Sequence, residues 1–181
     1  MKATRASVRG PASFRQAGLT LIETLVSLSI FALVVGGALA LFGSASASQN
    51  TTQFTSDLSA LRAATKALYF GQGTYGTGSL GEVLINGKKV PSTMTVAGAS
   101  PSRQINHSLN GSITVTGATA QFTVSATNIP TEICIGLASM GGWDSVKVGA
   151  LAARNPPVTP TQASTDCSTG GTVQTIVFTG S

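Results

Sequence analysis

An uncharged apolar run near the N-terminus constrains this chain more than any other feature. Residues 25–42 (LVSLSIFALVVGGALALF) contain no charged side chain. In a helix that rises about 1.5 Å per residue, a run of this length spans roughly 27 Å. The hydrocarbon core of a bilayer is about 30 Å thick. The run therefore predicts a helix that crosses a membrane.

The basic residues before this run predict its orientation. Four of them, and no acidic residue, lie within residues 1–18: Lys2, Arg5, Arg9 and Arg15. Because a positive flank stays in the cytoplasm, residues 43–181 are expected on the other side of the membrane. The rest of the chain holds seven basic and six acidic side chains, so the formal charge of +5 belongs mainly to this flank. No specific nucleic acid partner is expected, because a nucleic-acid-binding face clusters its basic residues on one surface.

A cleaved secretory signal peptide is the alternative to a membrane anchor. Ala45-Ser46-Ala47 provides an A-x-A cleavage motif after the apolar run. The apolar region of a signal peptide is typically about 7–15 residues, and this run is longer. The carboxylate of Glu23, between the basic flank and the run, is also unusual for a signal peptide. The two observations favour the anchor.

Helical periodicity continues beyond the apolar run. Apolar and small residues recur at spacings of four and three, at Phe54, Leu58, Leu61, Thr65 and Leu68. This pattern predicts an amphipathic helix whose other faces carry Asp57, Arg62 and Lys66. No proline lies between Pro11 and Pro91, so one helix is predicted over residues 19–70. It would be about 78 Å long, too long to be buried within one small domain.

The remainder of the chain has the periodicity of strands. Glycines between residues 71 and 81 end the helix, and Asn86-Gly87 predicts a tight hairpin turn. Residues 112–117 and 120–127 alternate polar and apolar side chains, with Phe122 and Val124 as candidate core residues. Strands are also predicted around Val146 and Val148 and over 172–178, a short helix over 131–140, and a loop over 150–171. The expected fold class is α+β, with the amphipathic half of the long helix on an antiparallel sheet.

The stretch from Ala17 to Glu23 (AGLTLIE) resembles the processing site of type IV prepilins. The resemblance implies that a prepilin peptidase cuts after Gly18 and methylates the new N-terminal residue, Leu19. Glu23 then occupies the fifth mature position, where the family has a glutamate. A carboxylate near the end of a membrane helix needs a partner, and we expect Glu23 to act in assembly by pairing with the new α-amino group of Leu19. The alternative is a simple membrane anchor in which Glu23 only reaches the interface.

Three further features resemble the type IVb branch of this family. The leader is 18 residues long, the first mature residue is Leu19, and Ser48-Gln49-Asn50 matches a tripeptide of some type IVb pilins. Residues 130–143 (PTEICIGLASMGGW) also resemble the cysteine-bearing segment of plasmid thin-pilus pilins. The resemblance therefore implies a long N-terminal helix packed on an antiparallel sheet.

The same resemblance divides the chain into five regions. The leader (1–18) is followed by the apolar transmembrane and polymerisation half of the helix (19–45) and by its amphipathic half (46–71). A loop region with possible short strands (72–110) precedes an antiparallel sheet with a disulfide-closed C-terminal region (111–181).

Cys134 and Cys167, the only cysteines, lie beyond the membrane segment, in a compartment that permits disulfides. From the residues alone, two free buried thiols remain the alternative. A zinc site is poorly supported, because Asp166 and His107 complete no ligand set with them. In type IV pilins a C-terminal cysteine pair closes a loop, and these two cysteines occupy the matching positions. The resemblance therefore implies a Cys134–Cys167 disulfide.

The implied function is that of a structural subunit that polymerises with identical subunits into an extracellular fibre for adhesion, aggregation or conjugation. The implied partners are a prepilin peptidase, an assembly ATPase with its platform, and the bacterial inner membrane that holds the precursor. No enzymatic activity, cofactor or metal is expected. His107, the only histidine, has no evident catalytic partners. A minor pilin, a secretion pseudopilin and a DNA-uptake pilin are the alternatives.

Overall fold

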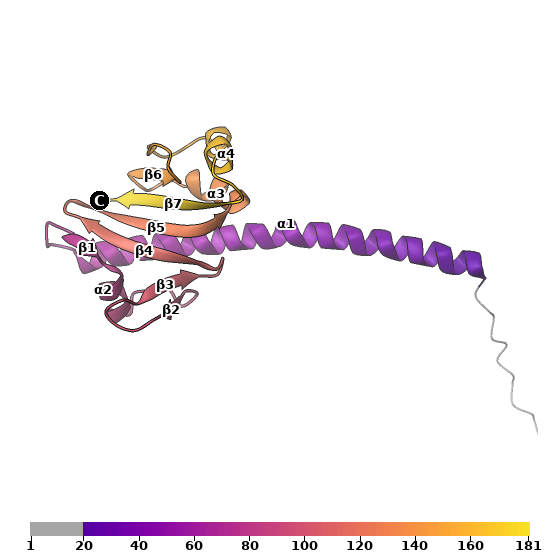
Figure 1. Ribbon diagram of the computed structural model, residues 1–181, viewed down its shortest axis with the longest axis horizontal. Helices are drawn as coiled ribbons and strands as arrows, with labels where there is room; N and C mark the ends of the chain where they lie inside the picture. The colour runs from indigo at the N-terminus through magenta and orange to yellow at the C-terminus, as the bar shows by residue number, and fades with distance from the viewer. Residues whose placement is uncertain (1–19) are drawn as a thin grey trace, which may run out of the picture. The chain divides into compact units, whose positions relative to one another are not determined.

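The computed structural model describes residues 20–181, without the side chains of residues 40, 42–44 and 47. Gly18 and Leu19, with the rest of the expected leader, lie outside the described residues. The chain divides into two units, Met1–Phe42 and Gly43–Ser181. The larger unit combines a helix with an antiparallel sheet (Figure 1), which confirms the expected α+β fold class.

Helix α1 runs without interruption from Leu21 to Leu68. It continues through Gly36 and Gly37 because no proline or capping residue interrupts the apolar run. The chain leaves the helix through Gly71, whose φ of 80° lies in the left-handed region that favours glycine. The predicted extent of 19–70 is therefore correct to within two residues at the end that the structure describes.

The predicted stripe of α1 is the face that packs in the core. Phe54, Leu58, Leu61 and Thr65 are at most 1% exposed. Asp57 differs from the expectation, because it is buried with them rather than on an open face. Its carboxylate accepts hydrogen bonds from the Gln53 amide (3.0 Å) and from the Thr93 hydroxyl (2.8 Å), which replace water.

Seven antiparallel strands form one sheet. They are β1 (Thr77–Ser79), β2 (Thr95–Ala97), β3 (Gln104–His107), β4 (Gly111–Ala118), β5 (Gln121–Pro130), β6 (Ser145–Val148) and β7 (Val173–Gly180). Their order is β2-β3-β4-β5-β7-β6, and β1 pairs with β4 beside β3. The three short strands lie within the region 72–110, where short strands were expected.

The register places one row of apolar side chains across the middle of the sheet. Val115 of β4 is opposite Val124 of β5, which is opposite Phe178 of β7, which is opposite Val146 of β6. All four side chains are buried and belong to the same core as the α1 stripe. The apolar residues of the alternation that predicts β4 and β5 therefore form the face of the sheet that packs on α1.

The hairpin predicted at Asn86-Gly87 is wrong. Residues Gly81–Asn86 form a short helix, α2, and Gly87 ends it with a φ of −73°. A two-residue hairpin turn of the favoured type needs positive φ at both central residues. The helix forms instead because Leu80 and Leu84, one turn apart, are both buried in the core. Burial therefore overrides the local turn preference.

The loop predicted over 150–171 is also only partly correct, because it contains helix α4 (Pro160–Ser168). Thr159 caps this helix by accepting a hydrogen bond from the backbone N–H of Gln162 (3.4 Å). Pro160 occupies the first turn, where its missing N–H costs nothing. The preceding helix, α3 (Thr131–Ala138), lies where the sequence predicts it.

Candidate assembly segment and disulfide region

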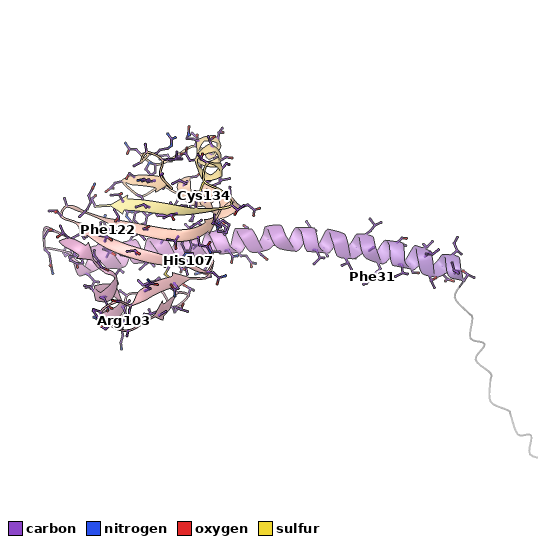
Figure 2. The ribbon with its side chains drawn as sticks, viewed as in Figure 1. Phe31, Arg103, His107, Phe122 and Cys134 are labelled. Atoms are coloured by element: carbon purple, nitrogen blue, oxygen red, sulfur yellow. A yellow bond between two sulfur atoms is a disulfide. The ribbon has the colours of Figure 1, made fainter. Side chains whose placement is uncertain are left out.

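Residues 21–41 of α1 present apolar side chains on all sides. Leu21, Phe31, Leu33 and Leu41 are each between 67% and 78% exposed, and Phe31 is labelled on this segment in Figure 2. Within it, Leu21–Leu39 is long and apolar enough to cross a membrane, with a mean hydropathy of 2.0. We call residues 21–41 the apolar segment. Burial of so much apolar surface requires an environment outside this chain, either lipid or other proteins.

Glu23 is the only ionisable side chain between Arg15 and Asp57. It lies in the first turn of α1, and its backbone N–H donates to the Thr20 carbonyl (3.0 Å). A negative charge in the first turn of a helix is favourable, because the N-terminal end of the helix dipole is positive. The exposed carboxylate faces no cation among the described residues. The Glu23 carboxylate is therefore free to pair with a cation outside the described residues.

Two hydroxyl groups of the apolar segment are satisfied within the helix. The Thr24 hydroxyl donates to the Leu21 carbonyl and the Ser29 hydroxyl to the Leu25 carbonyl, both at 2.8 Å. Such internal hydrogen bonds let a hydroxyl enter an apolar medium without losing a partner. Glu23 is the one ionisable side chain of this segment, so its charge is what most needs an external partner.

The C-terminal region is held by one disulfide. Cys134 of α3 and Cys167 of α4 are bonded, with their Cα atoms 5.9 Å apart, and both are fully buried. The pairing agrees with the expected one. It closes a loop that contains β6 and α4 and fixes α4 against α3.

An ion pair secures the same loop. The Arg154 guanidinium donates to both carboxylate oxygens of Asp166, with the Nη2–Oδ1 hydrogen bond at 2.9 Å. Gln162 adds a third hydrogen bond to this carboxylate (3.0 Å). The hydrogen bonds from Arg154 and then Gln162 lower the pKa of Asp166 below its usual range. Asp166 therefore stabilises the loop.

His107 has a structural role. It lies on β3 and is buried, within the region 72–110 that the sequence predicts as a loop with possible short strands. Its ring packs edge-on against Phe54 of α1, with ring centroids 4.8 Å apart. Its Nε2 is 2.9 Å from the Thr127 carbonyl oxygen, and its Nδ1 accepts from the Leu109 backbone N–H (3.3 Å). Burial lowers the pKa of His107 and keeps the ring neutral.

No group of three His, Cys, Asp or Glu side chains that could hold a metal ion occurs in residues 20–181. A cation–π contact joins α1 to the segment after α3: the Arg62 guanidinium lies over the Trp143 ring, 5.3 Å from its centroid. Local periodicity gives no signal for this pair, because the two residues are far apart in the chain.

Two protein-family models match this chain. The family model described as PilS N terminal matches residues 48–181, most of the chain. The model described as the prokaryotic N-terminal methylation motif matches residues 13–39. The chain belongs to the PilS family of type IVb-like pilins. Pilins are structural proteins and not enzymes, as the sequence predicts.

A solved structure of a pilin shares the fold. The pilin matches a type IVb pilin from Salmonella typhi with a TM-score of 0.56 and 22% identity, covering 68% of this chain and 97% of that one. It also matches TcpA, a type IV pilin from the Vibrio cholerae El Tor biotype, with a TM-score of 0.49 and 15% identity, covering 74% and 99%. No curated protein sequence matches it.

The methylation motif and the family each imply a step in the life of this pilin. It implies processing by a prepilin peptidase, and membership of the family implies polymerisation with assembly machinery. A prepilin with an apolar N-terminal helix fits a precursor held in the inner membrane and a later place in a pilus.

Proposed function

We propose that this pilin is the major subunit of a thin extracellular fibre used in adhesion, aggregation or conjugation. The observation that carries the proposal is the apolar segment, which exposes apolar side chains on all sides and contains a single carboxylate, Glu23. A soluble monomer gains nothing from such a segment. Lipid before assembly and a bundle of identical helices afterwards both bury it.

The transfer from lipid to a helix bundle sets the physical basis of assembly. Lipid is as apolar as the side chains themselves, so the hydrophobic effect does not favour one environment over the other. Packing between helices and electrostatic pairing must then decide assembly. Neither Gly36 nor Gly37 has a heavy atom of this chain within 4 Å of where a Cβ would lie, so both leave room for a neighbouring helix.

Glu23 supplies the electrostatic part of this proposal. Cleavage after Gly18 by the prepilin peptidase frees the α-amino group of Leu19, which is positive near neutral pH and is then methylated. In a growing fibre, Glu23 of one subunit pairs with this amine of its neighbour. Removing one partner of such a buried pair costs about 3–5 kcal/mol, so the pair fixes the axial register between subunits. The assembly ATPase and its membrane platform supply the work of extraction.

The experiment compares filament numbers for Glu23→Ala, Glu23→Gln and the wild-type protein at matched expression. Filaments are counted by electron microscopy after immunogold labelling, and the mature N-terminus is read by mass spectrometry. We expect all three proteins to begin at methylated Leu19. We expect few filaments from Glu23→Ala and at most an intermediate number from Glu23→Gln, because the amide cannot neutralise the amine.

Ser29→Ala is the matched control, because the Ser29 hydroxyl bonds only to its own helix in the described structure. It should assemble like the wild type. Wild-type numbers of filaments from Glu23→Ala would refute the role of Glu23. Immunogold label at only one or a few points of each filament would show a minor pilin instead of the major subunit.

A further inference from the structure

A basic groove lies on the larger unit, between α1 and the segment that follows α3. It has a volume of about 200 Å³ and is lined by Ser59, Arg62, Ala63, Lys66, Gly141 and Trp143. The four residues from α1 follow one another at spacings of three, one and three, so they form one face of the helix. Ser59, Ala63 and Lys66 are exposed. We call this site the Arg62 groove.

The Arg62 guanidinium is held in a position to bind an anion in this groove. The flat face of its guanidinium lies over Trp143, which leaves the N–H groups in the plane free to donate outward. Its Nε is buried and has no hydrogen-bond partner. A buried donor without an acceptor is unfavourable. Lys66, one helical turn further, forms no ion pair in residues 20–181 and adds a second positive charge. A carboxylate matches this pair of cations.

Most carboxylates of the larger unit are already engaged. Asp57 accepts two hydrogen bonds, and Glu82 and Asp166 form ion pairs with arginines. The other two, Glu132 and Asp144, are exposed and form no ion pair within the described part of the chain. If a second copy of this pilin binds in the Arg62 groove through a side-chain carboxylate, Glu132 and Asp144 are the two candidates.

Glu132 lies at the opposite end of strand β5 from the Arg62 groove. The Trp143 ring contacts Phe122, the second residue of β5, with ring centroids 6.2 Å apart. Glu132 follows the last residue of β5, Pro130. Eight residues of strand span about 26 Å, so Glu132 cannot reach the groove of its own chain. Figure 2 labels Phe122 and Cys134, which mark these two ends.

We propose that the Arg62 groove of one subunit binds the Glu132 carboxylate of the next subunit. The inference rests on the proposed function, because it needs a polymer. A contact between opposite ends of two copies is heterologous, and such a contact builds an open filament when its rotation does not close a ring. Asp144 is adjacent to Trp143, at the same end as the groove. Pairing through Asp144 would join like ends of two copies, which closes a dimer.

Zero-length crosslinking of wild-type filaments with a carbodiimide tests this contact, because it joins an amine to a carboxylate that touches it. We expect a ladder of covalent multimers and a crosslinked peptide between Lys66 and Glu132. The same treatment of detergent-solubilised monomers should give neither product. Lys66→Arg is the matched control, because it keeps the charge but removes the amine. This variant should form filaments that lack the crosslink.

A charge reversal supplies the second measurement. Glu132→Lys places a cation opposite the groove and should reduce filament numbers at least tenfold, while Asp144→Lys should leave them within twofold. Both residues are exposed, so equal thermal unfolding temperatures of the monomers will show that folding is unchanged.

The possible results separate the two proposals. Wild-type filaments without a Lys66–Glu132 crosslink would overturn this inference and leave the proposed function intact. A crosslink from Lys66 to Asp144, or to a different protein, would also overturn it. Absence of this chain from wild-type filaments would overturn the proposed function and the inference with it.

Discussion

Removing the disulfide should lower the stability of the larger unit by an amount that the structure sets. Cys134 and Cys167 are 33 residues apart in sequence and both fully buried. Closing a loop of this length in the unfolded chain contributes about 3.7 kcal/mol in the entropy model. We therefore expect the double variant Cys134→Ala/Cys167→Ala to lose about 3–4 kcal/mol of unfolding free energy. The double change avoids an unpaired buried thiol.

A fragment of residues 46–181 is suitable for this measurement. Every fully buried apolar side chain among the described residues lies between Phe54 and Phe178, so the fragment retains the core. For a domain of this size, each kcal/mol corresponds to about 3–5 °C in the midpoint of thermal unfolding. Circular dichroism should therefore show a decrease of roughly 10–18 °C.

The control is the wild-type fragment measured in a thiol reductant that keeps both cysteines reduced, which should show a similar decrease. Intact-mass analysis without reductant should find no free thiol in the native fragment. A loss below about 1 kcal/mol in both the double variant and the reduced fragment would refute the loop argument. Alkylation of two thiols in the native, mature protein would show that the disulfide does not form.

Two further predictions concern the core of the larger unit. A Cβ at Gly117 would lie 2.4 Å from the Tyr75 carbonyl oxygen, so Gly117→Ala should cost about 1–3 kcal/mol in urea unfolding. Gly141→Ala is the control and should stay within about 0.5 kcal/mol, because no heavy atom lies within 4 Å of the added Cβ; equal losses would contradict the packing argument. Since burial lowers the pKa of His107, the unfolded chain binds its proton more readily, and stability should fall as the pH drops below about 6.5 toward the lowered folded pKa. His107→Gln should remove that part of the difference between urea unfolding at pH 7.5 and pH 5.5, and an unchanged difference would show that other groups cause it.

The sequence predicts the elements whose signals are local. Helix α1 follows from an apolar run, a stripe from Phe54 to Leu68 and the lack of proline, all of which can be counted along the chain. Strands β4 and β5 follow from alternation. The length of the apolar run and the motif around Glu23 also predict the apolar segment, because a membrane imposes its thickness directly on the sequence.

The features that the sequence does not predict all depend on contacts between distant parts of the chain. Asn86-Gly87 favours a hairpin locally, but the burial of Leu84 decides for a helix. His107 has polar neighbours in sequence, yet Phe54, more than fifty residues earlier, provides its apolar contact. The pairing of Arg62 with Trp143 likewise depends on the completed fold. No window of neighbouring residues contains this information.

The position of β7 has a consequence for the synthesis of this pilin. This strand is the latest in sequence, yet it lies inside the sheet, between β5 and β6. A chain that stops before Val173 would leave the backbone groups of β5 unpaired along one edge and leave β6 without a neighbour. Such an open edge attracts other strands and exposes the chain to proteolysis. The larger unit can therefore close its sheet only after nearly all of its residues have been synthesised. A chain from interrupted translation is distinguished from a finished subunit by this open edge.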